Sequence, residues 1–146
     1  MKKIIVALAL AVAASMAMAT EVGVSAVRDY NLSGTGVRAT VSADKFYGFK
    51  PEASITRMSG VYNRYAIGAD YSIGSIGPVN FSGTGSGVYQ QTTNAKSGYG
   101  LSVGLVASVP VYKNVTLDAT VERFIGQNRI SNFNGINTTV GLSAKF

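Results

Sequence analysis

The chain has 146 residues, a length that fits one domain. It contains no cysteine, which excludes disulfide bonds and thiolate chemistry, and no histidine, the side chain that most often serves as a general base. Its formal charge of +6 is modest, and together with the export predicted below it argues against a nucleic-acid partner.

The first 19 residues have the pattern of a secretory signal peptide. Lys2 and Lys3 form a positive start, residues 4–14 are apolar, and Ala17 and Ala19 give a small-x-small cleavage site. The apolar run is too short to cross a bilayer as a helix, which needs roughly 20 residues. We therefore expect cleavage after Ala19 and one domain over 20–146; an uncleaved membrane anchor is the alternative.

From residue 20 onward, apolar and polar residues alternate between clusters of turn residues. This period of two indicates strands with one apolar face. The fifth segment is the weakest because Gly83, Gly85 and Gly87 dilute its apolar face, which predicts a bulge or a close backbone approach. The eight predicted strands are 20–30, 36–43, 52–58, 64–73, 79–90, 98–109, 115–125 and 138–146.

The connections alternate in length, as in barrels that cross a membrane. The 74–77 and 110–113 turns and the 44–50 connection fall at one end, whereas 31–35, 59–63, 91–97 and the longest, 126–137, fall at the other. Aromatic residues gather near both strand ends, where amphipathic rings meet a membrane surface. The tyrosines that this pattern places at the outer surface are Tyr30, Tyr62, Tyr65, Tyr89 and Tyr99.

Charges in mid-strand fall mainly on the less apolar face, so the aliphatic face is free to meet lipid. Strands in a bilayer must close their sheet, because an open edge leaves unpaired N–H and C=O groups in hydrocarbon. We therefore predict an all-β fold, a closed eight-stranded antiparallel up-and-down transmembrane β-barrel. A soluble periplasmic barrel that holds a small apolar ligand is the alternative, since soluble sheets alternate as well.

Two stretches carry a resemblance to known proteins: the last strand, VGLSAKF at 140–146, and GLVASVPVYKNVTL at 104–117. With the eight segments, they make the chain similar over 20–146 to the eight-stranded outer-membrane barrel family typified by OmpX, the transmembrane domain of OmpA and neisserial surface protein A. The resemblance implies an integral protein of the outer membrane. It also implies that Val140, Leu142 and Phe146 form a C-terminal signal, which would make the outer-membrane assembly machinery a partner.

The inward phase of such a barrel carries charges of both signs. An eight-stranded barrel has room inside only for its own side chains, and buried charges persist when they are paired. We therefore predict an interior ion-pair network in place of a water-filled pore, with a gated small conductance as the alternative. The predicted network comprises Arg38, Glu52, Arg64, Asp70, Asp118, Glu122 and Lys145, with Asp29 on the same phase.

Three arginines, Arg28, Arg57 and Arg123, fall on the lipid-facing phase in the outer half of the barrel. The guanidinium fork suits phosphate groups, so these arginines are candidate contacts to lipopolysaccharide, which with outer-membrane lipid would be a partner. The alternative is that they only extend their charged ends into the aqueous surface layer.

No catalytic, cofactor-binding or metal-binding residues are predicted. Outer-membrane barrel enzymes resemble systems built on an essential histidine, and the glycine-rich stretches 34–36 and 83–87 lack the lysine and the strand-to-helix context of phosphate-binding loops. We expect a non-enzymatic protein that stabilises the envelope or displays its loops, chiefly 126–137. The alternatives are an adhesin or resistance factor that binds a host or phage molecule through its outer loops, and a narrow pore for small solutes.

Overall fold

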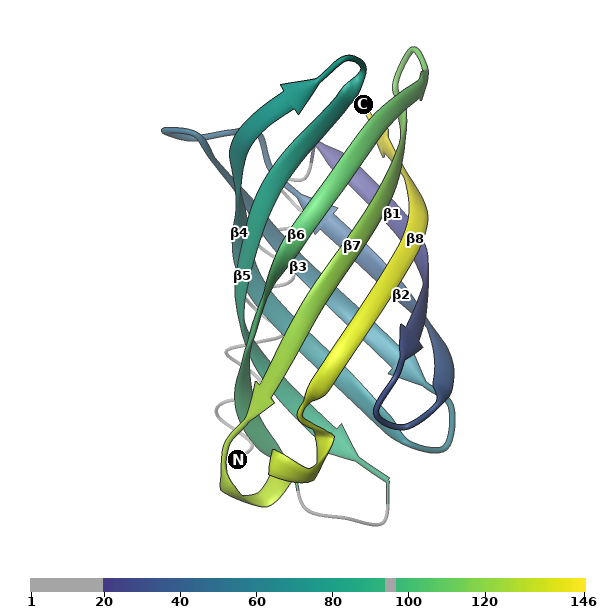
Figure 1. Ribbon diagram of the computed structural model, residues 1–146, viewed down its shortest axis with the longest axis vertical. Helices are drawn as coiled ribbons and strands as arrows, with labels where there is room; N and C mark the ends of the chain where they lie inside the picture. The colour runs from purple at the N-terminus through teal and green to yellow at the C-terminus, as the bar shows by residue number, and fades with distance from the viewer. Residues whose placement is uncertain (1–19, 94–96) are drawn as a thin grey trace.

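The computed structural model describes residues 20–93 and 97–146, which form a closed barrel of eight antiparallel strands (Figure 1). Each strand pairs with the next along the chain, and β8 closes the sheet against β1. The predicted fold is therefore confirmed, whereas the predicted signal peptide lies outside the described residues. The strands are β1 (Glu21–Asp29), β2 (Gly34–Ser42), β3 (Phe49–Met58), β4 (Tyr62–Ile76), β5 (Val79–Thr92), β6 (Gly98–Tyr112), β7 (Val115–Gly126) and β8 (Gly135–Lys145).

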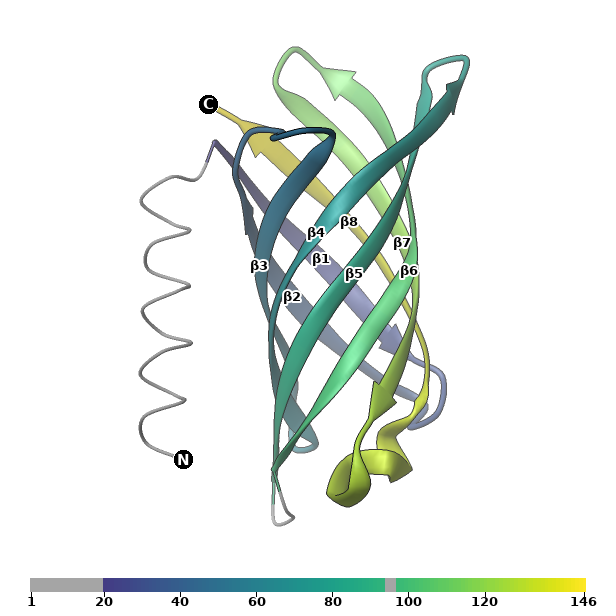
Figure 2. The ribbon, with the colours of Figure 1, turned by 90° about the vertical axis from the view of Figure 1, so that its left-hand side faces the viewer.

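The two ends of the barrel differ in their connections (Figures 1 and 2). The turn end carries the C-terminus, the 43–48 connection and two-residue turns at 77–78 and 113–114. The opposite, loop end carries the 30–33, 59–61 and 93–97 connections and the 3₁₀ segment η1 (Asn128–Phe133) between β7 and β8. In the described part of the chain, no helix is long and apolar enough to cross a membrane.

The strand faces follow the alternation of the sequence. Aliphatic side chains such as Val24, Leu105 and Leu142 point outward and are 62%, 59% and 52% exposed. The inward positions of the same strands are mostly serine, threonine, glycine or charged residues. Successive side chains of a strand point to opposite faces, so the register of the eight strands fixes every outward and inward position at once.

The strands differ from the prediction mainly at their ends. The fourth, predicted at 64–73, extends over Tyr62–Ile76, and the third begins three residues early at Phe49. The β5–β6 register is continuous through the glycines of β5, and the irregularity lies in β4, between Ser72 and Gly74. Of the β5 glycines, Gly85 faces open space, since nothing lies within 4 Å of a Cβ placed on it, whereas a Cβ on Gly83 would meet the Ile73 side chain at 3.7 Å.

Candidate functional site

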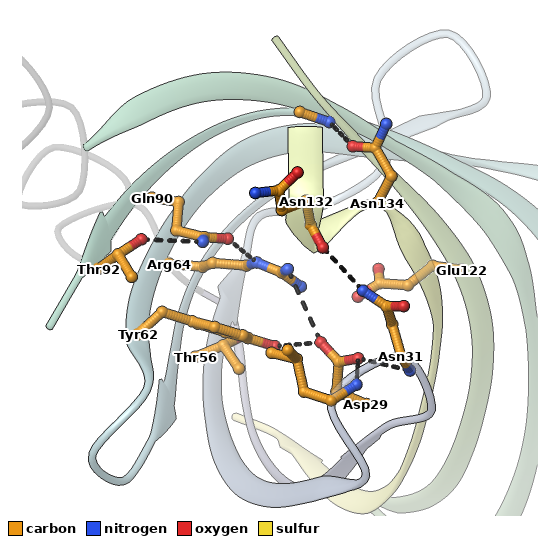
Figure 3. Close-up of polar contacts among 12 residues, drawn as sticks. Asp29, Asn31, Thr56, Tyr62, Arg64, Gln90, Thr92, Glu122, Asn132 and Asn134 are labelled. Atoms are coloured by element: carbon orange, nitrogen blue, oxygen red, sulfur yellow. Dashed lines mark hydrogen bonds and ion pairs between the residues drawn. The ribbon is translucent and has the colours of Figure 1, made fainter. Parts of the chain in front are cut away.

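A cluster of buried polar side chains closes the barrel at the loop end (Figure 3). Its centre is Arg64, whose guanidinium carbon lies 4.0 Å from the ring centre of Tyr62 and 3.9 Å from that of Phe124. Its Nη2 atom is 3.8 Å from Asp29 Oδ2, and its Nε donates to Gln90 Oε1 at 2.7 Å. Arg64 therefore combines an ion pair, a hydrogen bond and contact with two rings, which together offset the cost of burying its charge.

The other members of this Arg64 cluster form hydrogen bonds to the carboxylate of Asp29. The Tyr62 hydroxyl donates to Asp29 Oδ2 at 2.9 Å, and the backbone N–H groups of Asn31 and Leu32 donate to Oδ1 at 3.0 and 3.2 Å. With its amide oriented to suit both neighbours, Asn137 donates to Asp29 Oδ2 at 3.0 Å and accepts from Arg64 Nη1 at 2.7 Å.

Sequence reasoning predicts two of these residues as inward charges, Asp29 and Arg64, but misplaces a third. Tyr62 is expected at the outer membrane surface, yet it is 1% exposed and points into the barrel. The alternation of the strand could have shown the correct face of Tyr62. Tyr62 lies two residues before Arg64, so it shares the inward face once β4 begins at Tyr62. Phe124, Gln90 and Asn137 are missed because nothing in the sequence shows that they meet at one level of the barrel.

The η1 segment covers the Arg64 cluster as a lid. Ile130 is completely buried and packs with Val88 and Phe124, and the Phe133 ring meets Tyr62 edge-on at 6.1 Å. The Asn31 side chain donates to the Asn132 carbonyl at 2.9 Å, which ties the lid to the β1–β2 connection. The longest loop is thus docked into the barrel mouth.

A second ion pair crosses the interior below the lid. The Arg38 guanidinium of β2 donates to the Glu122 carboxylate of β7, three strands away around the wall, and its Nε donates to Thr56 Oγ1 at 2.8 Å. The structure therefore brings Arg38 and Glu122 together, as it does Arg64 and Asp29. Within the residues that it describes, it gives Glu52, Asp70 and Asp118 no ion pair; Asp118 accepts instead from the Ser143 hydroxyl at 2.6 Å.

Lys145 departs from the predicted interior network. Its Nζ atom lies 3.3 Å from Asp44 Oδ1, and the two side chains are 63% and 67% exposed. The physical reason is its position: β8 ends at Lys145, so an inward-phase side chain there emerges beyond the rim of the turn end. The lysine that does lie inside at that end is Lys50, whose Nζ donates to Glu21 Oε1 at 2.8 Å.

The prediction that side chains fill the barrel is also corrected. A cavity of about 520 Å³ extends from the turn end to Arg64 and Phe124 below the lid. It exists because most inward positions in this half carry small side chains, among them Ser25, Thr40 and Thr120, which cannot reach the barrel axis. Polar side chains dominate its lining, so it does not resemble a site for an apolar ligand.

The outer surface near the loop end is divided into two sectors. Arg123, Arg28 and Arg57 lie exposed on β7, β1 and β3; each is separated from the next by one strand and offset from it by two residues along the register. The β4, β5 and β6 strands carry Tyr65, Tyr89 and Tyr99 instead, and the middle ring, that of Tyr89, is only 8% exposed. These tyrosines are direct cross-strand partners, with ring centres 6.4 and 5.2 Å apart. We call these surfaces the arginine sector and the tyrosine sector.

The predicted C-terminal signal lies on the outward face of β8. Val140 and Leu142 are more than half exposed, and Phe146 follows the strand with its side chain 76% exposed. The backbone N–H of Phe146 donates to the Thr20 carbonyl at 2.9 Å. The three side chains therefore form an outward apolar row along the strand that closes the barrel.

Comparisons of the whole chain find matches among solved structures alone. Searches with protein-family models and of curated protein sequences give no match. The structure is similar to the N-terminal β-barrel domain of Pseudomonas aeruginosa OprF, with a TM-score of 0.70 and 13% identity over 88% of this chain and 98% of that one.

Two further solved structures share the architecture. Neisserial surface protein A (NspA) gives a TM-score of 0.60 at 18% identity, over 86% of this chain and 94% of its own. The Yersinia pestis outer-membrane protein Ail gives 0.56 at 12%, over 87% and 99%. These likenesses, with the closed strand order, show that the chain has the fold of the eight-stranded outer-membrane β-barrels.

Proposed function

We propose that the chain is a non-enzymatic integral protein of the outer membrane, which stabilises the envelope or displays its loops. The observation that carries this proposal is the band of exposed aliphatic side chains around a closed barrel, including Val103, Leu105 and Val121. Exposed apolar surface costs about 25 cal/mol per Å² in water, whereas acyl chains accommodate it. The polar cavity makes the soluble alternative, a barrel around an apolar ligand, a poor fit.

Cell fractionation and labelling test the proposal directly. We expect the protein in the outer-membrane fraction, soluble only with detergent, with a folded form whose gel mobility changes on heating. Because the chain has no cysteine, Leu105→Cys and Leu142→Cys provide single labelling sites. In lipid vesicles both should resist a water-soluble maleimide, whereas Lys113→Cys in the β6–β7 turn should react. Recovery of a folded protein in the soluble fraction without detergent would contradict the proposal.

The arginine sector supports lipopolysaccharide as a partner of this barrel. Its three guanidinium groups lie outside the wall near the loop end, at spacings that suit several phosphates of a lipid layer. The tyrosine sector on β4, β5 and β6 offers amphipathic rings, and none of the outward residues described on these three strands is a lysine or arginine. We therefore propose that lipopolysaccharide binds preferentially along β7, β8, β1, β2 and β3.

A second candidate function is surface binding through the loops. The docking of Ile130 and the Asn31–Asn132 hydrogen bond favour it, because they hold the η1 lid in one conformation. Ail, whose name is attachment invasion locus protein, has a barrel of the same architecture. Shortening the 127–134 connection while retaining the barrel should abolish binding to a host cell or phage if the lid carries it.

The narrow-pore alternative would require the Arg64 cluster and the lid to open, because both lie between the cavity and the loop end. We therefore expect little or no conductance from the protein in a planar bilayer. A steady conductance in the wild-type protein would favour the pore over the closed scaffold.

A further inference from the structure

The cavity inside the turn-end half of the barrel has the size of a ligand site. Its volume is about 520 Å³, within the range of roughly 300–1,000 Å³ that small-molecule sites occupy. Its rim at the turn end is exposed, and its far end is closed by Arg64 and Phe124. A solute could therefore enter only from the end that carries the C-terminus.

The charges that line this cavity are not balanced. Arg38 and Lys50 are each occupied by one carboxylate, those of Glu122 and Glu21. Of the two other lining cations, Arg64 pairs with Asp29, and Lys45 donates to the Ser72 hydroxyl. Three further acids of the lining, Glu52, Asp70 and Asp118, have no ion-pair partner in the part of the chain that is described, so they outnumber the one lining cation without a carboxylate, Lys45. Carboxylates removed from bulk water are costly unless a cation or hydrogen bonds compensate them, so the lining has an excess of negative charge to neutralise.

The placement of these carboxylates indicates the shape of a cation that would pair with all three. Glu52 and Asp70 belong to the neighbouring strands β3 and β4, whereas Asp118 lies on β7, four strands from β3 and hence on the opposite wall. No group of three acidic side chains in the described residues converges closely enough to hold a metal ion. An elongated molecule with separated cationic groups matches this spacing better than a single ion.

An unused hydroxyl lies deeper in the same cavity. Ser102 is 6% exposed and lines the closed end, and its Oγ atom has no hydrogen-bond partner among the described residues. Other lining hydroxyls are engaged, such as Ser143 with Asp118 and Ser72 with Lys45. A buried hydroxyl without a partner favours a polar group of a ligand, which could donate to it or accept from it.

We propose that the cavity binds a linear polyamine that enters from the turn end. Its ammonium groups pair with Glu52 and Asp70 on one wall and with Asp118 on the other, and its chain lies among the lining hydroxyls towards Ser102. This site does not rest on the proposed function, because it lies inside the barrel and is present in detergent as well as in a membrane.

Binding of spermidine to the folded chain in uncharged detergent tests the proposal by calorimetry at low salt. We expect one molecule per barrel, and an affinity at least tenfold weaker when Glu52→Gln, Asp70→Asn and Asp118→Asn are combined. The matched control is Asp44→Asn, which removes an exposed carboxylate at the same end outside the cavity lining and should bind as the wild type does. Absence of wild-type binding at millimolar spermidine, or equal binding by the triple variant, would overturn the proposal.

A second measurement covers the case in which the triple variant does not fold. A cysteine at Thr120→Cys would line the cavity, and one at Lys113→Cys lies in the turn outside its lining. Spermidine should slow the reaction of the first with a cationic thiol reagent by several-fold and leave the second unchanged. If spermidine protects neither cysteine, or both equally, the ligand does not occupy the cavity.

Discussion

Arg64 and Asp29 form a buried ion pair across the loop end of the barrel, with 3.8 Å between Nη2 and Oδ2. Each is held by further contacts, Asp29 by the Tyr62 hydroxyl and Arg64 by Gln90. The pair thus joins β1 to β4 and β5 at a point where no backbone ladder connects β1 with either. The ion pair therefore holds these three strands together inside the barrel, at its loop end.

Replacing Asp29 by Asn should destabilise the barrel strongly. The substitution keeps the size of the side chain but leaves the Arg64 cation buried without its counter-ion, and breaking such a pair costs about 3–5 kcal/mol. The free energy of unfolding in urea, measured with the barrel in lipid vesicles, gives the loss. Asp44→Asn is the control, since the exposed pair of Asp44 with Lys145 should contribute little.

Combining Asp29→Asn with Arg64→Met should be less harmful than the sum of the two single changes. Removal of both charges leaves neither one buried alone, so a double-mutant cycle should show a coupling of about 1–3 kcal/mol. Simple additivity of the two losses would show that the two side chains act independently and that their ion pair does not hold the barrel mouth.

The lid should detach when its buried anchor is made polar. Ile130 is fully buried against Val88 and Phe124, so Ile130→Asp would place an unpaired carboxylate in an apolar contact. We expect rapid trypsin cleavage after Arg129 in the folded variant, detected by mass spectrometry, and slow cleavage there in the wild type. Ile136→Asp is the control because Ile136 is 51% exposed; equal cleavage of wild type and Ile130→Asp would show that the lid is not anchored there.

The sequence predicts the barrel well because strand alternation is a local property. Parity alone places Arg38, Arg64 and Glu122 inside and Arg28, Arg57 and Arg123 outside, since one register determines both faces. Strand ends are less certain, because alternation fades where the strands leave the barrel. Tyr62 shows the consequence: its side chain is assigned to the wrong face when β4 is begun two residues late.

The pairing of interior charges could not be predicted because it depends on the third dimension. Arg38 and Glu122 are 84 residues apart in the sequence, and no sequence spacing encodes their contact. The cavity was missed for a related reason: the width of the barrel predicts a filled interior only if its inward side chains are large. A count of small inward residues such as Ser25, Thr40 and Thr120 would have predicted the space between them.

Removal of the arginine sector should weaken the association with lipopolysaccharide. The combined changes Arg28→Gln, Arg57→Gln and Arg123→Gln delete three charged hydrogen-bond donors and leave the inward face untouched. We expect several-fold less lipopolysaccharide to co-purify with the folded barrel. The matched control, Lys45→Gln with Lys113→Gln and Lys145→Gln, removes three cations from the turn end and should retain the wild-type amount. If the amount of lipopolysaccharide that co-purifies with the arginine variant is unchanged, these three arginines do not bind it and are ordinary charged residues at the rim.

Loss of the terminal aromatic ring should affect assembly more than stability. Phe146 is 76% exposed, and its backbone hydrogen bond to Thr20 persists in Phe146→Ala, so the free energy of unfolding of the refolded variant should change by less than about 0.5 kcal/mol. In cells, by contrast, we expect much less of the folded, heat-modifiable form in the outer membrane if the row of Val140, Leu142 and Phe146 is read during assembly. Val121→Ala is the control, because it shortens an outward apolar side chain on β7 that is also more than half exposed and lies outside the C-terminal row. A normal cellular level of Phe146→Ala would mean that the ring is not part of a recognition signal, and a large loss of stability would mean that its role is structural.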